Sequence, residues 1–112
     1  QVLLCRYRGV NPHPAAAGRL VAGRLILEPP VIDRLARRFN ALPPFPTGSF
    51  SCPADFGVQI VAIFRYLGPK SDDPVTLDPS GCASATNGHS VRGAMLAPGR
   101  ALISELESLT RD

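Results

Sequence analysis

Two cysteines bracket the most apolar stretch of the chain, and this pair constrains the fold more than any other feature. Cys52 precedes, and Cys82 follows, a segment in which residues 58–67 are almost continuously apolar. A polar Gly/Pro/Asp loop and a second strand-like run from residue 75 complete a hairpin between them. A disulfide between Cys52 and Cys82 would close a loop of roughly 30 residues and stabilise the domain by roughly 3–4 kcal/mol. The sequence predicts this bridge, with Cys5–Cys82 as the alternative pairing.

The odd number of cysteines bears on the compartment in which the protein works. Three cysteines imply one bridge and one spare thiol in a secreted protein, but three buried thiols in a cytosolic one. We expect the first case, and therefore a secreted or envelope-associated protein. Cys5 is expected on the inward face of the first strand, as a small buried apolar group. Because the chain begins with strand-like residues, we also expect that an upstream leader, anchor or linker has been removed.

Length and composition indicate one globular domain that covers residues 1–112. Hydrophobic residues make up 45% of the chain and charged residues 19%, which is enough apolar material for a single modest core. Eleven of the 12 basic residues are arginine, a bias that fits a high-GC bacterial genome. No apolar run reaches the roughly 18–20 residues that a membrane span needs, so this segment is not expected to cross a membrane.

The hydrophobic pattern predicts an α+β domain in the order β-β-α-β-β-β-β-α. Alternation predicts strands over residues 2–8, 20–27, 58–67, 75–78, 82–86 and 89–95. Apolar residues at helical spacing predict amphipathic helices from residue 28 to 42 and from residue 98 to 109. Because runs of hairpins separate the helices, we expect an antiparallel sheet. Asn87-Gly88 is typical of a two-residue type I′ turn between the last two strands.

Each predicted helix has a stripe of apolar side chains and recognisable ends. The apolar positions are Val31, Ile32, Leu35, Phe39 and Leu42 in the first helix and Leu102, Leu106 and Leu109 in the second. Proline is tolerated in the first turn of a helix, so Pro29 and Pro30 can begin the first one. Pro43 and Pro44 end it, because neither has an N–H group to continue the hydrogen-bond ladder.

Arg34, Arg37 and Arg38 fall largely outside the apolar stripe and form a basic patch on the first helix. A solvated helix face is the ordinary explanation of such a patch. Nucleic-acid binding is not expected, because a nucleic-acid platform interleaves aromatic side chains with the basic ones. If the patch has a partner, we expect an anionic lipid or an envelope polymer.

A loop rich in proline, glycine and serine follows the first helix and is the predicted interaction loop. It carries two aromatic residues, Phe45 and Phe50, and ends in Pro53, Ala54 and Asp55. Prolines stiffen such a loop, and exposed rings would provide contact area at small entropic cost. The alternative is that both rings cover the core beneath the loop.

No arrangement of residues in the sequence indicates a reaction. His13 and His89 lie at no recognised metal-ligand spacing from a cysteine or a carboxylate. His89 and Ser90 could enter a triad only without the Gly-x-Ser-x-Gly turn that supports one. Asp72, Asp73 and Asp78 lack the spacing of a calcium loop. We therefore expect a non-enzymatic protein with no cofactor and no metal site.

The cysteine bracket resembles the second half of subtilisin-inhibitor-like secreted proteins. In that family a Cys-Pro reactive loop precedes a hairpin and is tied by a disulfide to its far end, as Cys52-Pro53-Ala54-Asp55 and Gly81-Cys82 would be here. The resemblance covers about 31 residues and would place the bond-presenting residue at Ala54. The family's first disulfide has no counterpart, and the long C-terminal helix departs from its pattern.

The segments Cys5-Arg6-Tyr7, Cys52-Pro53-Ala54-Asp55 and Thr86-Asn87-Gly88 also resemble small domains of secreted proteins and lipoproteins from high-GC bacteria. That likeness implies no particular ligand. The leading hypothesis is a secreted or envelope-associated binding or accessory module whose partner is a protein or an envelope polymer. The alternative hypothesis is a protease inhibitor that uses residues 52–55. The oligomeric state is left open.

Overall fold

The computed structural model describes residues 1–9, 15, 17–47, 51–52, 57–65 and 72–111. Its elements are β1 (Val2–Tyr7), β2 (Leu20–Ile26), α1 (Pro29–Asn40), β3 (Gln59–Arg65), β4 (Asp72–Asp78), β5 (Ser84–Thr86), β6 (Val91–Gly93) and α2 (Ala97–Leu109). The predicted α+β class and the order of strands and helices are confirmed.

The strands form one antiparallel sheet in the order β2-β1-β3-β4-β5-β6. β1 lies between β2 and β3, with Leu3 opposite Leu25 on one side and opposite Ile63 on the other. The connection through α1 therefore returns the chain to the free edge of β1. β3 lies inside the sheet with a partner on each side.

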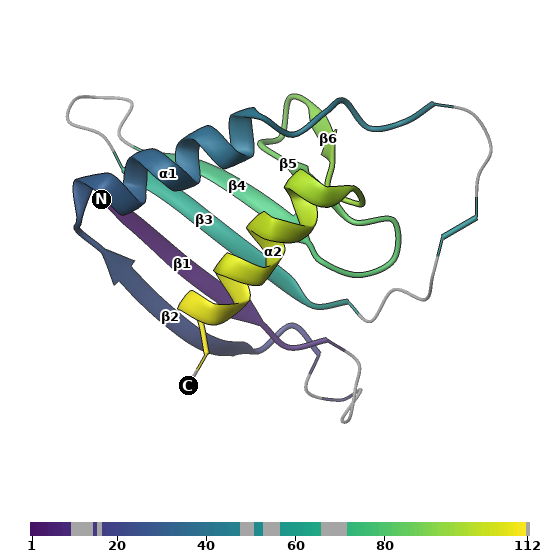
Figure 1. The fold of residues 1–112 in the computed structure, drawn as a ribbon. Coiled ribbons are helices and arrows are strands. Elements are labelled where there is room, and N and C mark those ends of the chain that lie inside the picture. The colour runs from purple at the N-terminus through teal and green to yellow at the C-terminus, as the bar shows by residue number, and fades with distance from the viewer. Residues whose placement is uncertain (10–14, 16, 48–50, 53–56, 66–71, 112) are drawn as a thin grey trace.

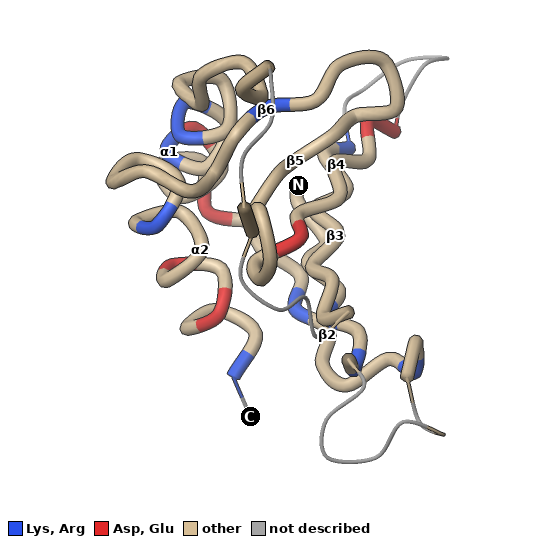
Figure 2. The backbone as a smooth tube through the Cα atoms, turned by 90° about the vertical axis from the view of Figure 1, so that its right-hand side faces the viewer, with Lys and Arg blue, Asp and Glu red and all other residues tan. Residues whose placement is uncertain are grey.

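Both helices lie against the same face of the sheet (Figure 1). Seen from the side, the described part of the molecule has two layers, with the helices on one side of the strands and no described element on the other (Figure 2). We call the helix-covered side the inner face and the opposite side the outer face. Residues that alternate along a strand point to opposite faces. The described residues therefore build one core, on the inner face.

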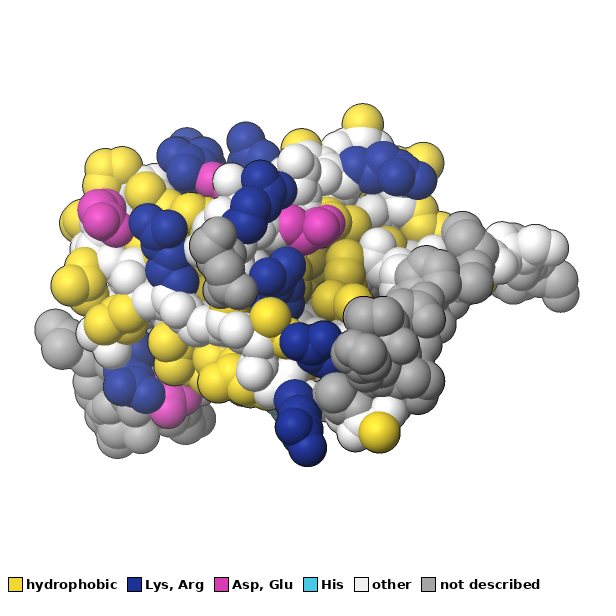
Figure 3. Space-filling model, turned by 90° about the horizontal axis from the view of Figure 1, so that it is seen from below, with side chains coloured by type: hydrophobic (Ala, Val, Ile, Leu, Met, Phe, Trp, Pro, Cys, Tyr) yellow, Lys and Arg dark blue, Asp and Glu magenta, His cyan; other side chains and the backbone are white. Residues whose placement is uncertain are grey.

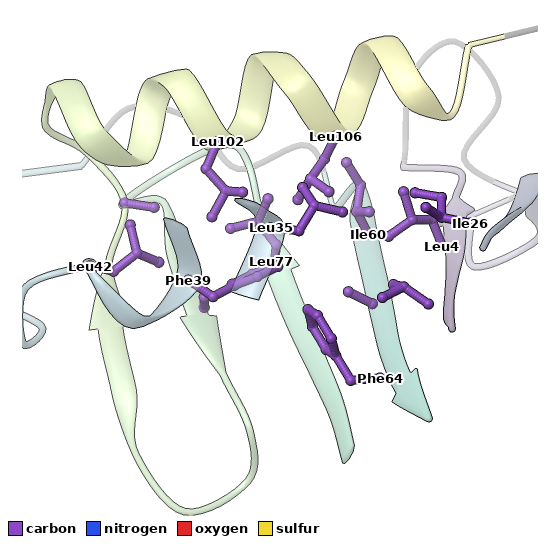
Figure 4. Close-up of a cluster of buried hydrophobic side chains, with 14 of the residues drawn as sticks. Leu4, Ile26, Leu35, Phe39, Leu42, Ile60, Phe64, Leu77, Leu102 and Leu106 are labelled. Carbon is purple, nitrogen blue, oxygen red and sulfur yellow. The ribbon is translucent and has the colours of Figure 1, made fainter. Parts of the chain in front are cut away.

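The core joins the apolar stripes of both helices to the inner face (Figure 4). Its fully buried side chains include Val2, Leu4, Leu35, Leu42, Ile60, Leu77, Leu102 and Leu106. The rings of Phe39 on α1 and Phe64 on β3 meet edge to face, with their centroids 6.0 Å apart. The predicted stripes are confirmed, with Val31, Ile32 and Leu109 packed at the rim of the core.

The ends of α1 follow the prolines around it. Pro29 and Pro30 occupy the first turn, and Glu28 at the N-cap makes no side-chain capping bond. The backbone N–H of Ala41 donates to the carbonyl of Arg37 at 2.9 Å, and the N–H of Leu42 donates to the carbonyl of Phe39 at 3.2 Å, which completes the last turn. Leu42 is buried directly before Pro43, so the chain leaves the helix with its last apolar side chain still in the core.

The β5–β6 hairpin is confirmed, but its predicted turn type is wrong. Thr86 pairs with Val91, which leaves residues 87–90 as a four-residue loop. Gly88 has a φ of 90°, whereas Asn87 does not adopt the positive φ that a type I′ turn requires. Instead, the side-chain oxygen of Asn87 accepts hydrogen bonds from the backbone N–H groups of His89 and Ser90. The asparagine closes the loop through its side chain rather than through its backbone conformation.

Candidate functional site

The predicted disulfide between Cys52 and Cys82 is present, and Cys5 is a free thiol. The Cα atoms of Cys52 and Cys82 are 5.0 Å apart. The bridge ties the segment before β3 to the loop between β4 and β5. Cys52 is exposed and Cys82 is half-buried. Four residues of the predicted interaction loop, Phe50, Pro53, Ala54 and Asp55, lie outside the described residues.

Phe45, the described member of that loop, is half-buried beside β6. Its backbone N–H donates to the carbonyl of Val91 at 3.2 Å, and the N–H of Gly93 donates to the carbonyl of Pro43 at 2.8 Å. Pro44 forms an antiparallel bridge with Arg92. The segment after α1 therefore continues the sheet beyond β6. A small cavity of about 160 Å³ lies beside it, lined by Pro43, Pro44, Pro46, Gly93, Met95 and Leu96.

The basic patch on α1 is partly neutralised by one residue of α2. The Arg34 Nε donates to Glu105 Oε2 at 2.8 Å, and Arg38 Nε lies 3.4 Å from Glu105 Oε1. Arg37 donates instead to the backbone carbonyl of Asp33. Arg34 and Arg38 thus connect the two helices, whereas Arg37 forms no ion pair with a described carboxylate. This weakens the case for the patch as a binding surface.

The outer face of the sheet is apolar although no described element covers it. Cross-strand partners place Leu25, Leu3, Ile63 and Pro74 in one row. The next row contains Gly23, Cys5, Val61 and Thr76. A third row brings Leu20, Tyr7 and Gln59 together. All of these residues are half-buried or exposed.

Cys5 lies on this outer face, so its predicted inward orientation is wrong. Val2 and Leu4 are fully buried on the inner face, whereas Cys5 is partly exposed. Its cross-strand partner on β2 is Gly23, which has no side chain to cover it. Burial raises the pKa of the Tyr7 phenol above its ordinary value, and the neighbouring Cys5 raises it further.

The apolar side chains of the outer face are most exposed on β2, and an ion pair lies at one border of the face. Leu25 is 51% exposed and Leu20 is 60% exposed. At the end of the sheet near the N-terminus, Arg65 Nε lies 3.0 Å from Asp72 Oδ1, between neighbouring strands β3 and β4. The outer face is therefore an exposed apolar surface with a polar border, a common form of interaction surface.

A second hollow lies at the opposite end of β1, next to the β1–β2 turn. It has a volume of about 210 Å³ and is lined by Arg6, Tyr7, Arg8, Gly9, Val21 and Val58. We call it the arginine cavity. Figure 3 views the molecule from below its orientation in Figure 1, and that side shows more dark-blue basic side chains than magenta acidic ones. The sequence alone does not reveal this cavity, because Arg6 and Arg8 belong to a strand pattern rather than to a recognisable motif.

No group of three or more histidine, cysteine or acidic side chains within the described residues could hold a metal ion. His89 is exposed in its turn. Within the same residues, no helix is long and apolar enough to cross a membrane.

Comparisons with known proteins add no relative. No family model matches the sequence, and no similar curated protein or solved structure was found.

Proposed function

We propose that this domain is a secreted or envelope-associated, non-enzymatic binding module that binds a partner protein through the outer face of its sheet. The observation that supports the proposal is the exposed apolar surface formed by β2, β1, β3 and β4. Since β1, β3 and β4 already have neighbours on both sides, a partner would contact their side chains rather than their backbones.

The size of this surface suits protein binding. Strands lie about 4.8 Å apart and rise about 3.3 Å per residue, so four strands of six residues span roughly 400 Å². The largest apolar patch on a typical monomer covers about 300–600 Å² and often has a function. A flat area of side chains also fits a second folded surface better than it fits a small molecule, which is usually held in a concave pocket.

The disulfide supports both the compartment and the mode of binding. An intramolecular bridge is compatible with an oxidising compartment, where such bonds persist. It also ties the β4–β5 loop to the segment before β3, next to the strands that form the surface. A surface held rigid in advance loses less entropy when a partner binds.

The test is a substitution at the most accessible part of the outer face. Leu25→Arg places a charge on the surface, and because Leu25 is 51% exposed, the fold should tolerate the change. Leu96→Arg is the matched control, since Leu96 is 69% exposed next to α2 and away from the outer face. A photoreactive residue at position 3, beside Leu25 in the same row, reports on contact with a partner.

We expect cross-linking to a specific protein in the native envelope fraction for the parent domain and for Leu96→Arg, and a loss of about tenfold or more for Leu25→Arg. Thermal unfolding should show that both variants are folded. Equal cross-linking by all three proteins, or none by the parent domain, would reject the proposed surface.

A second candidate function is supported by the position of the disulfide. The bridge ties Cys52, which directly precedes the segment that the inhibitor resemblance assigns as the reactive loop, to Cys82. Dose-dependent inhibition of a subtilisin-like protease that Ala54→Pro abolishes would support an inhibitor. An oxidised domain that leaves the protease fully active would exclude it.

A further inference from the structure

We infer that the arginine cavity is a binding site for a phosphate group. The inference is independent of the outer face, because it rests on charges and a cavity at one end of the sheet. Arg6 and Arg8 are two residues apart on the same chain and therefore point to the same face, about 6.6 Å apart along it. A phosphate has enough oxygen atoms to accept hydrogen bonds from both guanidinium groups.

One atom of Arg6 lacks the partner that a phosphate would supply. Its Nε is buried and makes no hydrogen bond. A buried donor without an acceptor costs about 1–3 kcal/mol, so side chains are seldom left in this state without a reason. The Nε–H and the neighbouring terminal nitrogen form one of the two forks by which arginine binds an oxyanion with a pair of hydrogen bonds. The Nε is closed to solvent in this fold, so an anion would accept from this edge once the side chain turns toward the cavity that it lines.

Six of the nine other arginines make a side-chain hydrogen bond or ion pair, whereas Arg19, Arg24 and Arg111 make none with a described residue. Arg34 and Arg38 meet the carboxylate of Glu105, and Arg65 meets that of Asp72. Arg92 and Arg100 donate to backbone carbonyls of Leu42 and Met95. No ion pair with a described carboxylate satisfies Arg6 or Arg8. Their charges are therefore available to a ligand.

The backbone keeps the two arginines in place. The N–H of Arg8 donates to the carbonyl of Arg19 at 2.8 Å, and the N–H of Gly18 donates to the carbonyl of Arg8 at 2.8 Å. These bonds extend the pairing of β1 and β2 beyond Tyr7. The register also shifts between Arg6 and Tyr7, where β2 carries an extra residue, Val21, that lines the cavity. Bulges commonly re-aim side chains near binding sites.

The cavity has room for the group that we propose. A water molecule occupies about 30 Å³ of liquid, so a volume of about 210 Å³ admits a tetrahedral phosphate together with some of its hydration water. The phosphate could be free or could belong to a lipid headgroup, and both present the same chemistry to the arginines.

The test measures binding of inorganic phosphate, glycerol phosphate and vesicles of phosphatidylglycerol or phosphatidylcholine to the oxidised domain. Arg6→Gln and Arg8→Gln each remove one guanidinium. Arg6→Lys keeps the charge but removes the fork of donors. Arg37→Gln is the matched control, since it removes the same charge from an exposed position on α1. Thermal unfolding checks that every variant is folded.

We expect the dissociation constant for phosphate to rise about tenfold or more in Arg6→Gln and Arg8→Gln, to rise in Arg6→Lys, and to change less than about twofold in Arg37→Gln. Binding to phosphatidylglycerol vesicles, again lost in Arg6→Gln, would identify a headgroup as the source, whereas binding of the soluble phosphates alone would identify a free anion. No phosphate binding by the parent domain, or equal weakening by all the substitutions, would overturn the inference. Leu25→Arg should retain phosphate binding, so the two proposals can fail separately.

Discussion

Gly99 shows how closely single residues are fitted in this fold. It is buried in the first turn of α2, where the helix passes over Ala94. A Cβ atom added at Gly99 would overlap the backbone of Ala94, which cannot move aside as a flexible side chain could. The requirement comes from close packing, since nothing indicates a strained backbone at this position.

Gly99→Ala is therefore expected to lower the free energy of unfolding by about 1–3 kcal/mol, although alanine is the better helix former. Gly23→Ala is the control, because a Cβ there would meet its nearest atom, the carbonyl oxygen of Leu4, at an ordinary 3.8 Å. Denaturant unfolding of the two variants measures the difference. A Gly99→Ala domain as stable as the parent would show that the helix can shift away from Ala94.

Residue patterns predicted the strands but not always which face is covered. Both faces of β1 are largely apolar, and the sequence predicts that Cys5, which shares a face with Leu3 and Tyr7, points inward. The core nevertheless uses the face of Arg6, which lies opposite Ile60 near the end of β1, where its long side chain lines the arginine cavity. Periodicity alone could not choose the face, because the choice depends on where both helices pack.

At the scale of elements, the helices were predictable and their connection was not. Helical spacing of apolar residues identified both helices and their buried stripes. The ion pairs between α1 and α2 depend on Glu105, whose side chain is only 15% exposed between two arginines of α1. The sequence places Arg34 and Arg38 one turn apart on one helix and Glu105 on the other. It does not predict that the two helices lie side by side.

Replacement of Glu105 measures the strength of this connection. Glu105→Ala should lower the free energy of unfolding by about 1 kcal/mol more than Glu107→Ala, because Glu107 is exposed and makes no ion pair with a described residue. The difference should shrink in 1 M salt, where charges are screened over about 3 Å. Urea unfolding at low and high salt provides the measurement. A difference that salt leaves unchanged would assign the effect to lost packing instead.

At the scale of the whole molecule, the disulfide holds together parts of the sheet that are distant in the sequence. It closes a loop of 30 residues that contains β3 and β4, two of the strands inside the sheet. The sequence predicted the pairing because the cysteines flank the most apolar hairpin. The outer face and the arginine cavity needed the strand order, which brings β1 beside β3 although 51 residues separate the end of one from the start of the other.

Removal of this bridge should destabilise the whole domain. The double variant Cys52→Ala, Cys82→Ala is expected to lose about 3–4 kcal/mol of unfolding free energy, and the parent protein should lose the same amount in excess reductant. Cys5→Ala is the control and should remain as sensitive to reductant as the parent. Guanidinium unfolding with and without reductant makes the comparison. A parent domain that is indifferent to reductant would show that the fold does not depend on the bridge.

The proline segment beside β6 has a consequence for how these molecules behave at high concentration. Its hydrogen bonds to β6 come from Pro43 and Phe45, so the backbone groups of Pro44 point away from the sheet. Proline has no N–H, and a strand from another molecule would therefore find no donor there. At the other edge, β2 carries a bulge and the exposed Arg24, both of which discourage added strands. The sheet is thus protected at both edges against growth into fibrils, even though one of its faces is apolar and open.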